Sequence, residues 1–384
     1  MGNILYTSKN QFFIKADGEP AKQYDSQKIA TYIDNAKKIK DRNEWKTSGS
    51  GAKFMGKYNF ADDANVYEGE VSINGASFYK GGLVYSASLG ALGGLYKKGL
   101  EADDIEGHII ASNSMRIYKV DVFEDSCAAS IGSYTERHVA VFDIKTGRYQ
   151  ELTEGDTIED YPSYSKSGNR LFFSSAGVAR SPHGHVEGIG PSGICAYDIE
   201  SGSLEELFES DKFNYISPKE DKDGSILFIK HPYKNSRDSS NIFLDILMFP
   251  IRIVKAILGL LNYFSIAFGG ESLRSGKAGS DIRSKQKSEK ELFFEGNMIN
   301  AERELKANQR RGEKFPGIIP QTWELVRAVK DGSQACIKKG VMDYTICKNG
   351  DIIYSNGHEI IRLSPDGKEN LLEKCHLAVN LREI

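Results

Sequence analysis

The fold of this chain is decided by a stretch that occurs twice, first as Val141-Phe142-Asp143-Ile144-Lys145-Thr146-Gly147-Arg148-Tyr149-Gln150-Glu151-Leu152 and again as Ala196-Tyr197-Asp198-Ile199-Glu200-Ser201-Gly202-Ser203-Leu204-Glu205-Glu206-Leu207. Each copy has the pattern of a β-hairpin: alternating apolar residues, a turn at Asp-Ile-x-Ser/Thr-Gly, and a second run that ends in Leu. Gly147 and Gly202 stand where the turn needs a positive φ, which glycine adopts without a steric penalty. Self-similarity at this spacing predicts stacked β-units.

Another pair of strands precedes each hairpin. The clearest pair is Tyr161-Pro162-Ser163-Tyr164 and Arg170-Leu171-Phe172-Phe173-Ser174, joined by a turn at 166–169. Four strands per unit is the size of a propeller blade, so the sequence predicts an all-β propeller. The same pattern recurs at 214–216 with 226–229, and at 343–345 with 352–355.

This succession of an inner strand, a glycine turn, a strand ending in Ser and an Asp-Ile-x-Ser/Thr-Gly hairpin resembles the repeats of TolB-like propellers. The resemblance covers most of the chain except 23–48 and 235–320, and it implies a propeller fold. The family's Ser-Pro-Asp-Gly turn between the first two strands is altered here. It is Ser165-Lys166-Ser167-Gly168 in one unit and Cys347-Lys348-Asn349-Gly350 in another.

The predicted strands make five units and a sixth blade shared by the chain ends, so residues 1–384 form one propeller domain. The first unit starts at Ile73 and the second starts near Ile109. Closure by both termini would remove exposed strand edges from the ring. The strands of the shared blade are 376–381 on the inside, with 3–7 and 12–15 outside it.

Composition favours a cytoplasmic protein. The 384 residues are 40% hydrophobic, which allows a large core. A net charge of −3 gives no reason to expect nucleic acid as a partner. The first residues lack the basic-then-apolar pattern of a signal sequence, although TolB-like proteins are often exported. The cysteines are odd in number and lack metal-type spacing, which favours reduced thiols: Cys127, Cys195, Cys336, Cys347 and Cys375.

Residues 23–45 have the pattern of an accessory helix. Ser26 precedes Ile29, Ile33, Ala36 and Ile39, which are spaced to share one helix face. Two interpretations remain open: the helix packs on the propeller, or it docks a partner.

Residues 235–320 interrupt the repeat, because they separate two predicted strands of the fourth blade, 226–231 and 323–329. A blade needs no excursion of this length. Segment 242–268 is the most apolar run of the chain and has a narrow polar stripe on a helical wheel. Its predicted partner or membrane contacts are Ile242, Phe243, Leu247, Phe249, Ile253, Ile257, Leu260, Leu261, Phe264 and Phe268.

A transmembrane span is excluded for 242–268, because both ends of the excursion join one blade and a returning span lacks apolar residues. The alternatives are a helix on an anionic membrane surface, a partner or oligomer contact, and packing on the propeller. The pattern Ser288-Glu289-Lys290-Glu291 predicts a helix from there to about Arg310. A basic flank, either drawn to anionic head groups or a solvated linker, contains Arg274, Lys277, Arg283, Lys285 and Lys287.

The longest predicted connections, 87–94, 124–136 and 175–193, follow the second strand of their units, as the insertion does. Equivalent connections emerge on one face of a propeller, which makes that face the candidate functional surface. The inner strands start there with a polar residue followed by Tyr, which predicts either hydrogen bonds between blades or ligand contacts at the channel mouth. These candidates are Asp160, Tyr161, Asn214, Tyr215, Asp343 and Tyr344.

Chemical signatures are few. His183, His185 and Glu187 are candidate ligands for a divalent metal, and no other cofactor is expected. The chain has no Gly-x-Ser-x-Gly nucleophile motif and no Walker phosphate loop. The sequence therefore predicts a non-catalytic scaffold propeller that binds a protein partner, and one of the alternatives for the insertion places it on the cytoplasmic side of a membrane. The alternative is a small-molecule sensor, or a metal-dependent lyase or hydrolase, acting at the channel mouth.

Overall fold

The computed structural model describes residues 2–47, 71–101, 104–233, 291–295, 297–329 and 332–384. The chain divides into two units, Met1–Tyr233 with Leu305–Ile384, and Lys234–Glu304. The described part of the second unit consists of β19 (Glu291–Phe294), β20 (Asn297–Asn300) and the start of α4 (Ala301–Arg310). The apolar segment 242–268 and the basic flank lie outside the described residues. In the part of the chain that is described, no helix is long and apolar enough to cross a membrane.

The first unit contains separate four-stranded sheets of antiparallel neighbours, most of which are joined by short turns. One of these sheets combines strands from both ends of the chain. The sheets are β27 (Val379–Glu383), β1 (Ile4–Ser8), β2 (Gln11–Lys15) and β3 (Lys22–Tyr24); β4 (Val71–Tyr79), β5 (Gly82–Leu89), β6 (Leu92–Gly99) and β7 (Gly107–Ser112); β17 (Phe213–Glu220), β18 (Ile226–Pro232), β21 (Glu324–Ala328) and β22 (Gln334–Lys339); and β23 (Asp343–Ile346), β24 (Ile352–Ser355), β25 (Glu359–Leu363) and β26 (Glu369–Lys374).

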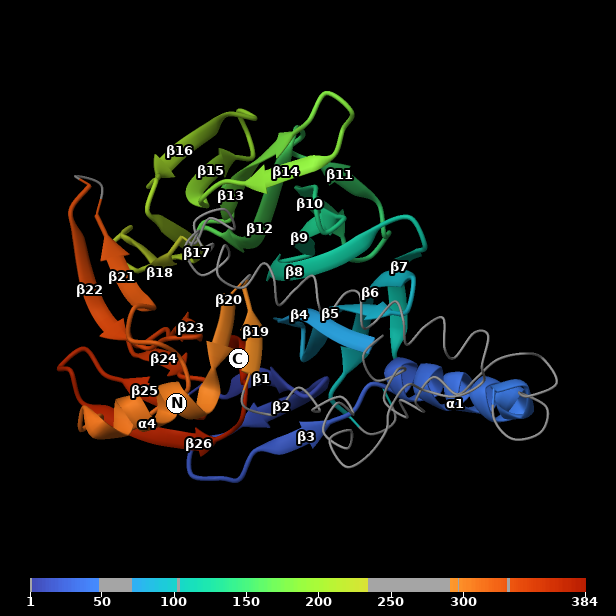
Figure 1. The fold of residues 1–384 in the computed structure, drawn as a ribbon, viewed down its shortest axis with the longest axis horizontal. Helices are drawn as coiled ribbons and strands as arrows, with labels where there is room; N and C mark the ends of the chain where they lie inside the picture. Colours follow the sequence, from blue (N-terminus) through green and yellow to red (C-terminus); the bar gives the residue numbers. More distant parts are fainter. Residues whose placement is uncertain (1, 48–70, 102–103, 234–290, 296, 330–331) are drawn as a thin grey trace, which may run out of the picture. The chain divides into compact units, whose positions relative to one another are not determined.

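A nine-stranded sheet contains two further meanders. They are joined by a single parallel pair of residues, Arg137 with Ile158. The first strands of all the meanders contact one another in the cyclic order β4, β8, β12, β17, β23, β27. The sheets of this unit therefore lie around a common centre (Figure 1). Six separate blades stay a prediction, because the nine-stranded sheet links two meanders. Its strands are β8 (Arg116–Phe123), β9 (Ser126–Gly132), β10 (Arg137–Asp143), β11 (Tyr149–Glu151), β12 (Thr157–Tyr164), β13 (Arg170–Arg180), β14 (Val186–Ile189), β15 (Gly193–Asp198) and β16 (Leu204–Phe208).

The repeated stretch forms the same hairpin twice, as β10 with β11 and as β15 with β16. Oδ1 of Asp143 accepts the backbone N–H of Thr146 at 2.7 Å, and Oδ1 of Asp198 accepts that of Ser201 at 2.8 Å. The following glycine has a φ of 72° in the first copy and 69° in the second. The Asp and Gly of the motif thus fix the turn, and the sequence prediction for these hairpins is confirmed.

The strands on either side of the insertion are neighbours, as the sequence predicts. β18 pairs with β21 from Ile226 opposite Ala328 to Lys230 opposite Glu324. At the chain ends, β1 pairs with β2 on one side and with β27 on the other. The inner strand of that sheet starts at Val379, a little later than the predicted 376.

Several predicted boundaries are wrong. Ile109 lies in β7, the outer strand of the β4 sheet, and does not start the next unit. Strand β9 occupies most of 124–136, and β5 and β6 occupy most of 87–94, because left-handed residues at Glu124 and Gly90 close tight turns. These two segments are therefore not long connections.

The helix expected to start at the Ser288-Glu289-Lys290-Glu291 pattern starts later. Glu291 belongs to β19, which pairs with β20. The helix α4 begins at Ala301, where Oδ1 of Asn300 accepts the backbone N–H of Arg303 at 2.9 Å. Asparagine is among the best N-cap residues, so the cap rather than the Ser-x-x-Glu pattern sets the helix start.

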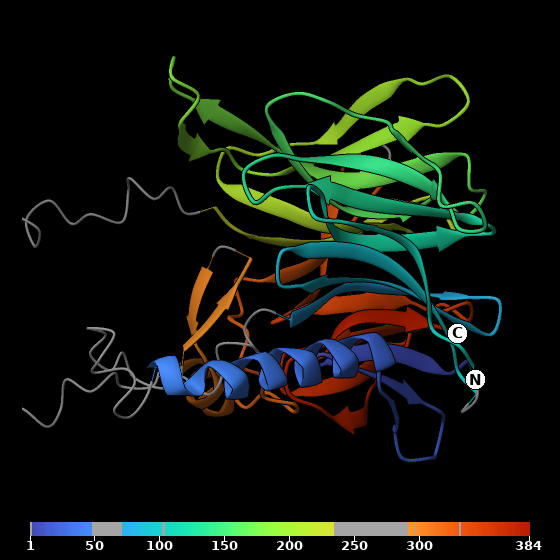
Figure 2. The same ribbon diagram turned by 90° about the vertical axis from the view of Figure 1, so that its right-hand side faces the viewer.

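The helix predicted within 23–45 is α1 (Gln27–Thr47), which runs along the first unit (Figure 2). Oγ of Ser26 accepts the backbone N–H of Ile29 at 3.1 Å and caps the helix. Ile29 is 6% exposed and belongs to an apolar cluster with Phe12 and Tyr85. The first turns of α1 therefore pack on the sheets, which agrees with the packing interpretation.

Candidate ligand-binding site

The inner strands of the first unit are interrupted by β-bulges. The pairing register shifts between Ile117 and Val120 in β8, between Asp160 and Ser163 in β12, and between Ile216 and Lys219 in β17. A bulge inserts an extra residue, bends the strand and re-aims the side chains that follow. It therefore changes which side chains of each inner strand face the centre.

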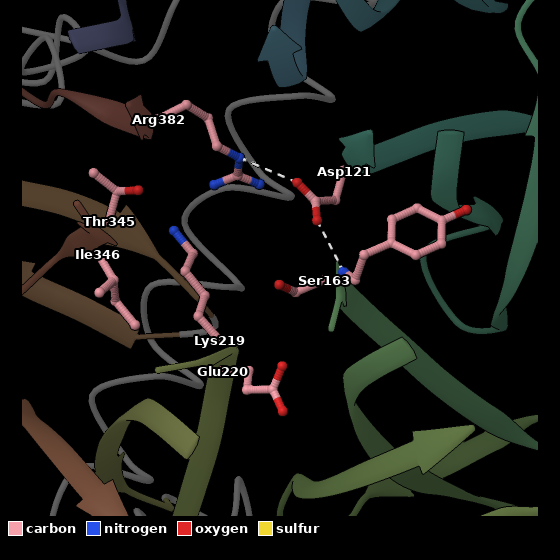
Figure 3. A pocket seen from close by; sticks show the side chains of 8 residues that line it. Asp121, Ser163, Lys219, Glu220, Thr345, Ile346 and Arg382 are labelled. Atoms are coloured by element: carbon pink, nitrogen blue, oxygen red, sulfur yellow. Dashed lines mark hydrogen bonds and ion pairs between the residues drawn. The ribbon is translucent and has the colours of Figure 1, made fainter. Parts of the chain in front are cut away.

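A cavity of about 160 Å³ lies among the inner strands, beyond these bulges. Five strands contribute to its wall: β8, β12, β17, β23 and β27. Figure 3 shows the amine of Lys219 and the guanidinium of Arg382 pointing toward each other inside it. The lining residues are Asp121, Ser163, Tyr164, Lys219, Glu220, Thr345, Ile346 and Arg382.

Lys219 brings an amine into this wall. Its Nζ donates to the backbone carbonyl of Tyr344 and lies 4.8 Å from the centre of the Tyr344 ring. Burial lowers the pKa of Lys219 from 10.5 to about 7, and the neighbouring positive charge of Arg382 contributes to the same shift. The negative charges of Asp343 and Asp121 act in the opposite direction and raise the pKa of Lys219. The amine therefore changes its charge near neutral pH.

Arg382 lies opposite, between β27 and β8. Its Nε is 3.4 Å from Oδ1 of Asp121, and its Nη2 donates to the carbonyl of Val120 at 3.2 Å. Among the described residues, that buried Nε has no hydrogen-bond acceptor with good geometry. Asp121 also accepts the backbone N–H of Tyr164 at 2.9 Å, so it links neighbouring inner strands.

The chemistry of this wall suits a small polar ligand that carries an acidic group. Lys219 and Arg382 can neutralise a carboxylate, and Ser163 and Thr345 can donate hydroxyl hydrogen bonds. The Asp121 carboxylate lies beside the Arg382 guanidinium, and Glu220 follows Lys219 in β17, so these carboxylates would disfavour a ligand with a second negative charge.

The side chains predicted at the channel mouth do not line this cavity. The candidates lie earlier along their strands and make contacts between strands. Oδ2 of Asp160 pairs with Arg137, and Oδ1 of Asn214 accepts the backbone N–H of Ser192 at 2.9 Å. Their role as ligand contacts stays a prediction.

Tyr215, Asp343 and Tyr344 are likewise integrated into the sheets. Tyr215 is 5% exposed within an apolar cluster. Oδ2 of Asp343 accepts the backbone N–H of Leu381 at 3.1 Å. The hydroxyl of Tyr344, which is fully buried, shares its single hydrogen between the carbonyls of Leu227 at 2.6 Å and Ser217 at 2.8 Å. Tyr161, the remaining candidate, occupies the β12 bulge with a φ of 57°.

The residues predicted as metal ligands lie in and next to the turn between β13 and β14. His183 and His185 lie between β13 and β14, and Glu187 lies in β14; all of them are exposed. The backbone N–H of Ser181 donates to the carbonyl of His185 and closes this turn. No group of three His, Cys, Asp or Glu residues suited to a metal occurs in the ranges that the structure describes. The three candidates are therefore not gathered into a site here.

The sequence contained a signal for the cavity that differs from the recurring pattern of a polar residue followed by Tyr. Tyr161 and Ser217 both have a φ of 57°, and each is followed by a proline and then by a cavity residue, Ser163 or Lys219. Proline inside a strand marks a bulge or an edge, because it lacks an N–H for the ladder. Aligning the units on these prolines would have placed Ser163 and Lys219 at equivalent positions.

Comparison with known proteins bears on the fold. No family model and no curated protein matches the sequence. The structure of TolB from Acinetobacter baumannii is 12% identical, with a TM-score of 0.50 over 99% of this chain and 66% of that one. A chain of a nidogen/laminin complex is 6% identical, with a TM-score of 0.52 over 99% of this chain and 98% of that one. At such identities the likeness concerns the fold, and this protein has a TolB-like β-propeller fold.

Proposed function

We propose that this protein is a non-catalytic binding propeller whose central cavity receives an acidic group from a protein partner. One observation carries the proposal: Lys219 and Arg382 converge in a cavity of about 160 Å³. The acidic group is either a side-chain carboxylate or the carboxylate at the end of a peptide.

The cationic groups of the cavity support a carboxylate as the ligand. Lys219 Nζ donates to a backbone carbonyl rather than to a carboxylate, and Arg382 Nε lacks a well-aligned acceptor among the described residues. Hydrogen bonds to charged groups stabilise by about 1.5–3 kcal/mol, more than neutral ones. An arriving carboxylate would also favour the protonated form of Lys219, so binding should take up a proton at neutral pH.

A protein partner is favoured over a free small acid by the shape of the fold. Propeller inner strands end at one face, and a peptide terminus or acidic side chain can enter there while the rest of the partner covers the surrounding turns. The chain of similar fold from the nidogen/laminin complex is itself part of a protein assembly. A small-molecule sensor remains the second candidate, because the cavity would also admit a free acid.

The test compares three probes by isothermal titration calorimetry. The first is a Gly/Ser hexapeptide that ends in Asp with a free terminal carboxylate. The second is the same peptide with Asn in place of Asp and a terminal amide, and the third is free succinate. We expect the acidic peptide to bind at least tenfold more tightly than the other two. Lys219→Gln should weaken the acidic peptide at least tenfold, and Lys348→Gln, at an exposed lysine, should leave it unchanged.

Two results would overturn the protein-partner proposal. Equal affinity for succinate and the acidic peptide would make the protein a small-molecule sensor. Absence of saturable binding by all the probes would remove the anion site itself.

Membrane association through the insertion is a separate proposal that rests on the sequence of 242–268 and its basic flank. Flotation with anionic vesicles, with and without residues 235–320, tests it. Equal flotation of both proteins would contradict it.

A further inference from the structure

We infer that Lys219 is an amine nucleophile that condenses reversibly with a small carbonyl compound bearing a carboxylate, such as a 2-oxo acid. This goes beyond the proposed binding role, because it adds a covalent bond to the protein. It uses the same cavity but does not depend on the nature of the protein partner.

The position of the amine is the first argument. Lys219 lines a cavity that is enclosed by five strands, and its Nζ donates a hydrogen bond to the backbone carbonyl of Tyr344. A backbone carbonyl orients the amine without adding a negative charge that would keep it protonated. Figure 3 shows the space between Lys219, Ser163 and Arg382 into which a ligand would enter.

The charges around Lys219 are the second argument. Arg382 on β27 and Lys119 on β8 disfavour the ammonium form, whereas Asp343 on β23 and Asp121 on β8 favour it. Glu220 lies beside it on β17, and Tyr164 lies across the cavity on β12. The resulting pKa of about 7 leaves a large fraction of the amine neutral at neutral pH. Neutral amines are the form in which lysines react with carbonyl groups.

The reaction balances without an oxidant or a reductant. The nitrogen lone pair adds to the carbonyl carbon, and the π pair moves to oxygen, which takes up a proton while nitrogen loses one. Protonation of the resulting hydroxyl lets it leave as water, and the C=N bond forms. Ser163 and Glu220 lie in the wall and can carry these protons. Addition of water reverses each step.

Arg382 supplies the selectivity. The carboxylate of a 2-oxo acid would lie against its guanidinium, which brings the adjacent carbonyl carbon toward Lys219. Holding two reacting groups in this way raises the effective concentration of the carbonyl. A carbonyl compound of similar size without a carboxylate lacks that contact.

The test traps the C=N bond on the full chain. The protein is incubated with glyoxylate or with acetaldehyde, reduced with cyanoborohydride, and mapped by peptide mass spectrometry. We expect Lys219 to be labelled by glyoxylate at least tenfold more than exposed Lys348, and at least tenfold more than by acetaldehyde. The labelling rate should rise with a midpoint near pH 7. Lys219→Arg, which keeps a cation but no nucleophilic amine, should abolish the product at this position.

Labelling spread evenly over exposed lysines would overturn the inference, and so would a rate that still rises steeply above pH 9. Either result, together with carboxylate-dependent peptide binding by the same wild-type protein, would leave the proposed binding function standing. If Lys219 is labelled specifically but the wild-type protein does not bind the peptide, the inference stands and the proposed binding function is contradicted.

Discussion

Two buried polar clusters of this propeller are built differently. The first, which we name the helix anchor, consists of Tyr85, Glu106 and Ser26. Oε1 of Glu106 accepts the Tyr85 hydroxyl at 2.6 Å, Oε2 accepts the backbone N–H of Lys28 at 2.8 Å, and the Tyr85 hydroxyl lies 2.9 Å from Oγ of Ser26. The second is the central cavity, where Lys219 donates to a backbone carbonyl and Arg382 has a buried Nε without a good acceptor among the described residues.

This difference separates stability from binding. In the helix anchor, each carboxylate oxygen of Glu106 has a donor and the residue is 4% exposed, which leaves no space for a ligand. In the cavity, the polar groups are incompletely paired and adjoin open volume. Fully paired buried networks rigidify a core, whereas incompletely paired ones need an explanation outside the fold. Substitutions in the anchor should therefore affect folding, and those in the cavity should affect ligands.

The largest effect is expected from Glu106→Ala in the helix anchor. It removes the acceptor of the part-buried Lys28 N–H and the carboxylate acceptor of the Tyr85 hydroxyl, which then has only Ser26 Oγ as a partner. An orphaned buried group costs about 1–3 kcal/mol, so the free energy of unfolding should fall by about 3 kcal/mol. Urea unfolding followed by circular dichroism measures this change.

Glu101→Ala is the matched control, because Glu101 is exposed and contacts Asp104 through its backbone N–H and carbonyl, which the substitution retains. It should change the free energy of unfolding by less than about 0.5 kcal/mol. If both variants unfold alike, the anchor is not the structural element that its hydrogen bonds indicate.

A smaller and two-sided effect is expected from Asp121→Asn at the cavity. The amide oxygen can still accept the Tyr164 N–H, but the ion pair with Arg382 is lost. Because both side chains are only partly buried, unfolding free energy should fall by about 1–2 kcal/mol. Binding of the acidic peptide should strengthen at the same time, since a competing carboxylate is gone.

The two readouts together check the comparison between the clusters. A destabilised Asp121→Asn protein that binds the peptide more weakly would place Asp121 with the helix anchor, as a purely structural residue. Asp125→Asn on an exposed turn is the control, and it should leave peptide binding unchanged.

The sequence predicted those parts of the fold that local turn chemistry determines. Asp143 and Asp198 hold their turns by contacts within a few residues, so their hairpins could be recognised from the sequence alone. The pairing of β18 with β21 was also predictable, because the repeat requires a partner for each second strand. The boundaries near Ile109 and Glu291 were not, since strand pairing outweighed the local signals at these two residues.

The cavity was not predictable from the pattern of polar residues followed by Tyr. Asp121, Ser163 and Lys219 reach it only after the bulges in their strands, and a bulge shifts the side-chain alternation of everything that follows. Asn214 and Lys219 are both in β17, but only Lys219 lies beyond the shift and lines the cavity. The pKa of Lys219 depends on Arg382, which is far away in the sequence and comes close only through the sheet at the chain ends.

The smallest effect, and the one of opposite sign, is expected from Lys219→Met. The pKa of this amine is about 7 in the folded protein and 10.5 when unperturbed, so the unfolded state binds more protons between these values. The free energy of unfolding of the wild-type protein should therefore rise with pH across that window. Below pH 7 the buried amine is charged in the folded protein too, so the destabilisation by this charge has its full value there. Lys219→Met removes that cost, and because the side chain is partly exposed we expect a gain of about 1 kcal/mol at pH 6. The gain should shrink steadily and vanish near pH 10.5, as measured by urea unfolding at each pH. Lys348→Met should show no such trend, and a gain from Lys219→Met that is constant with pH would mean that packing, not charge, distinguishes the cavity from the helix anchor.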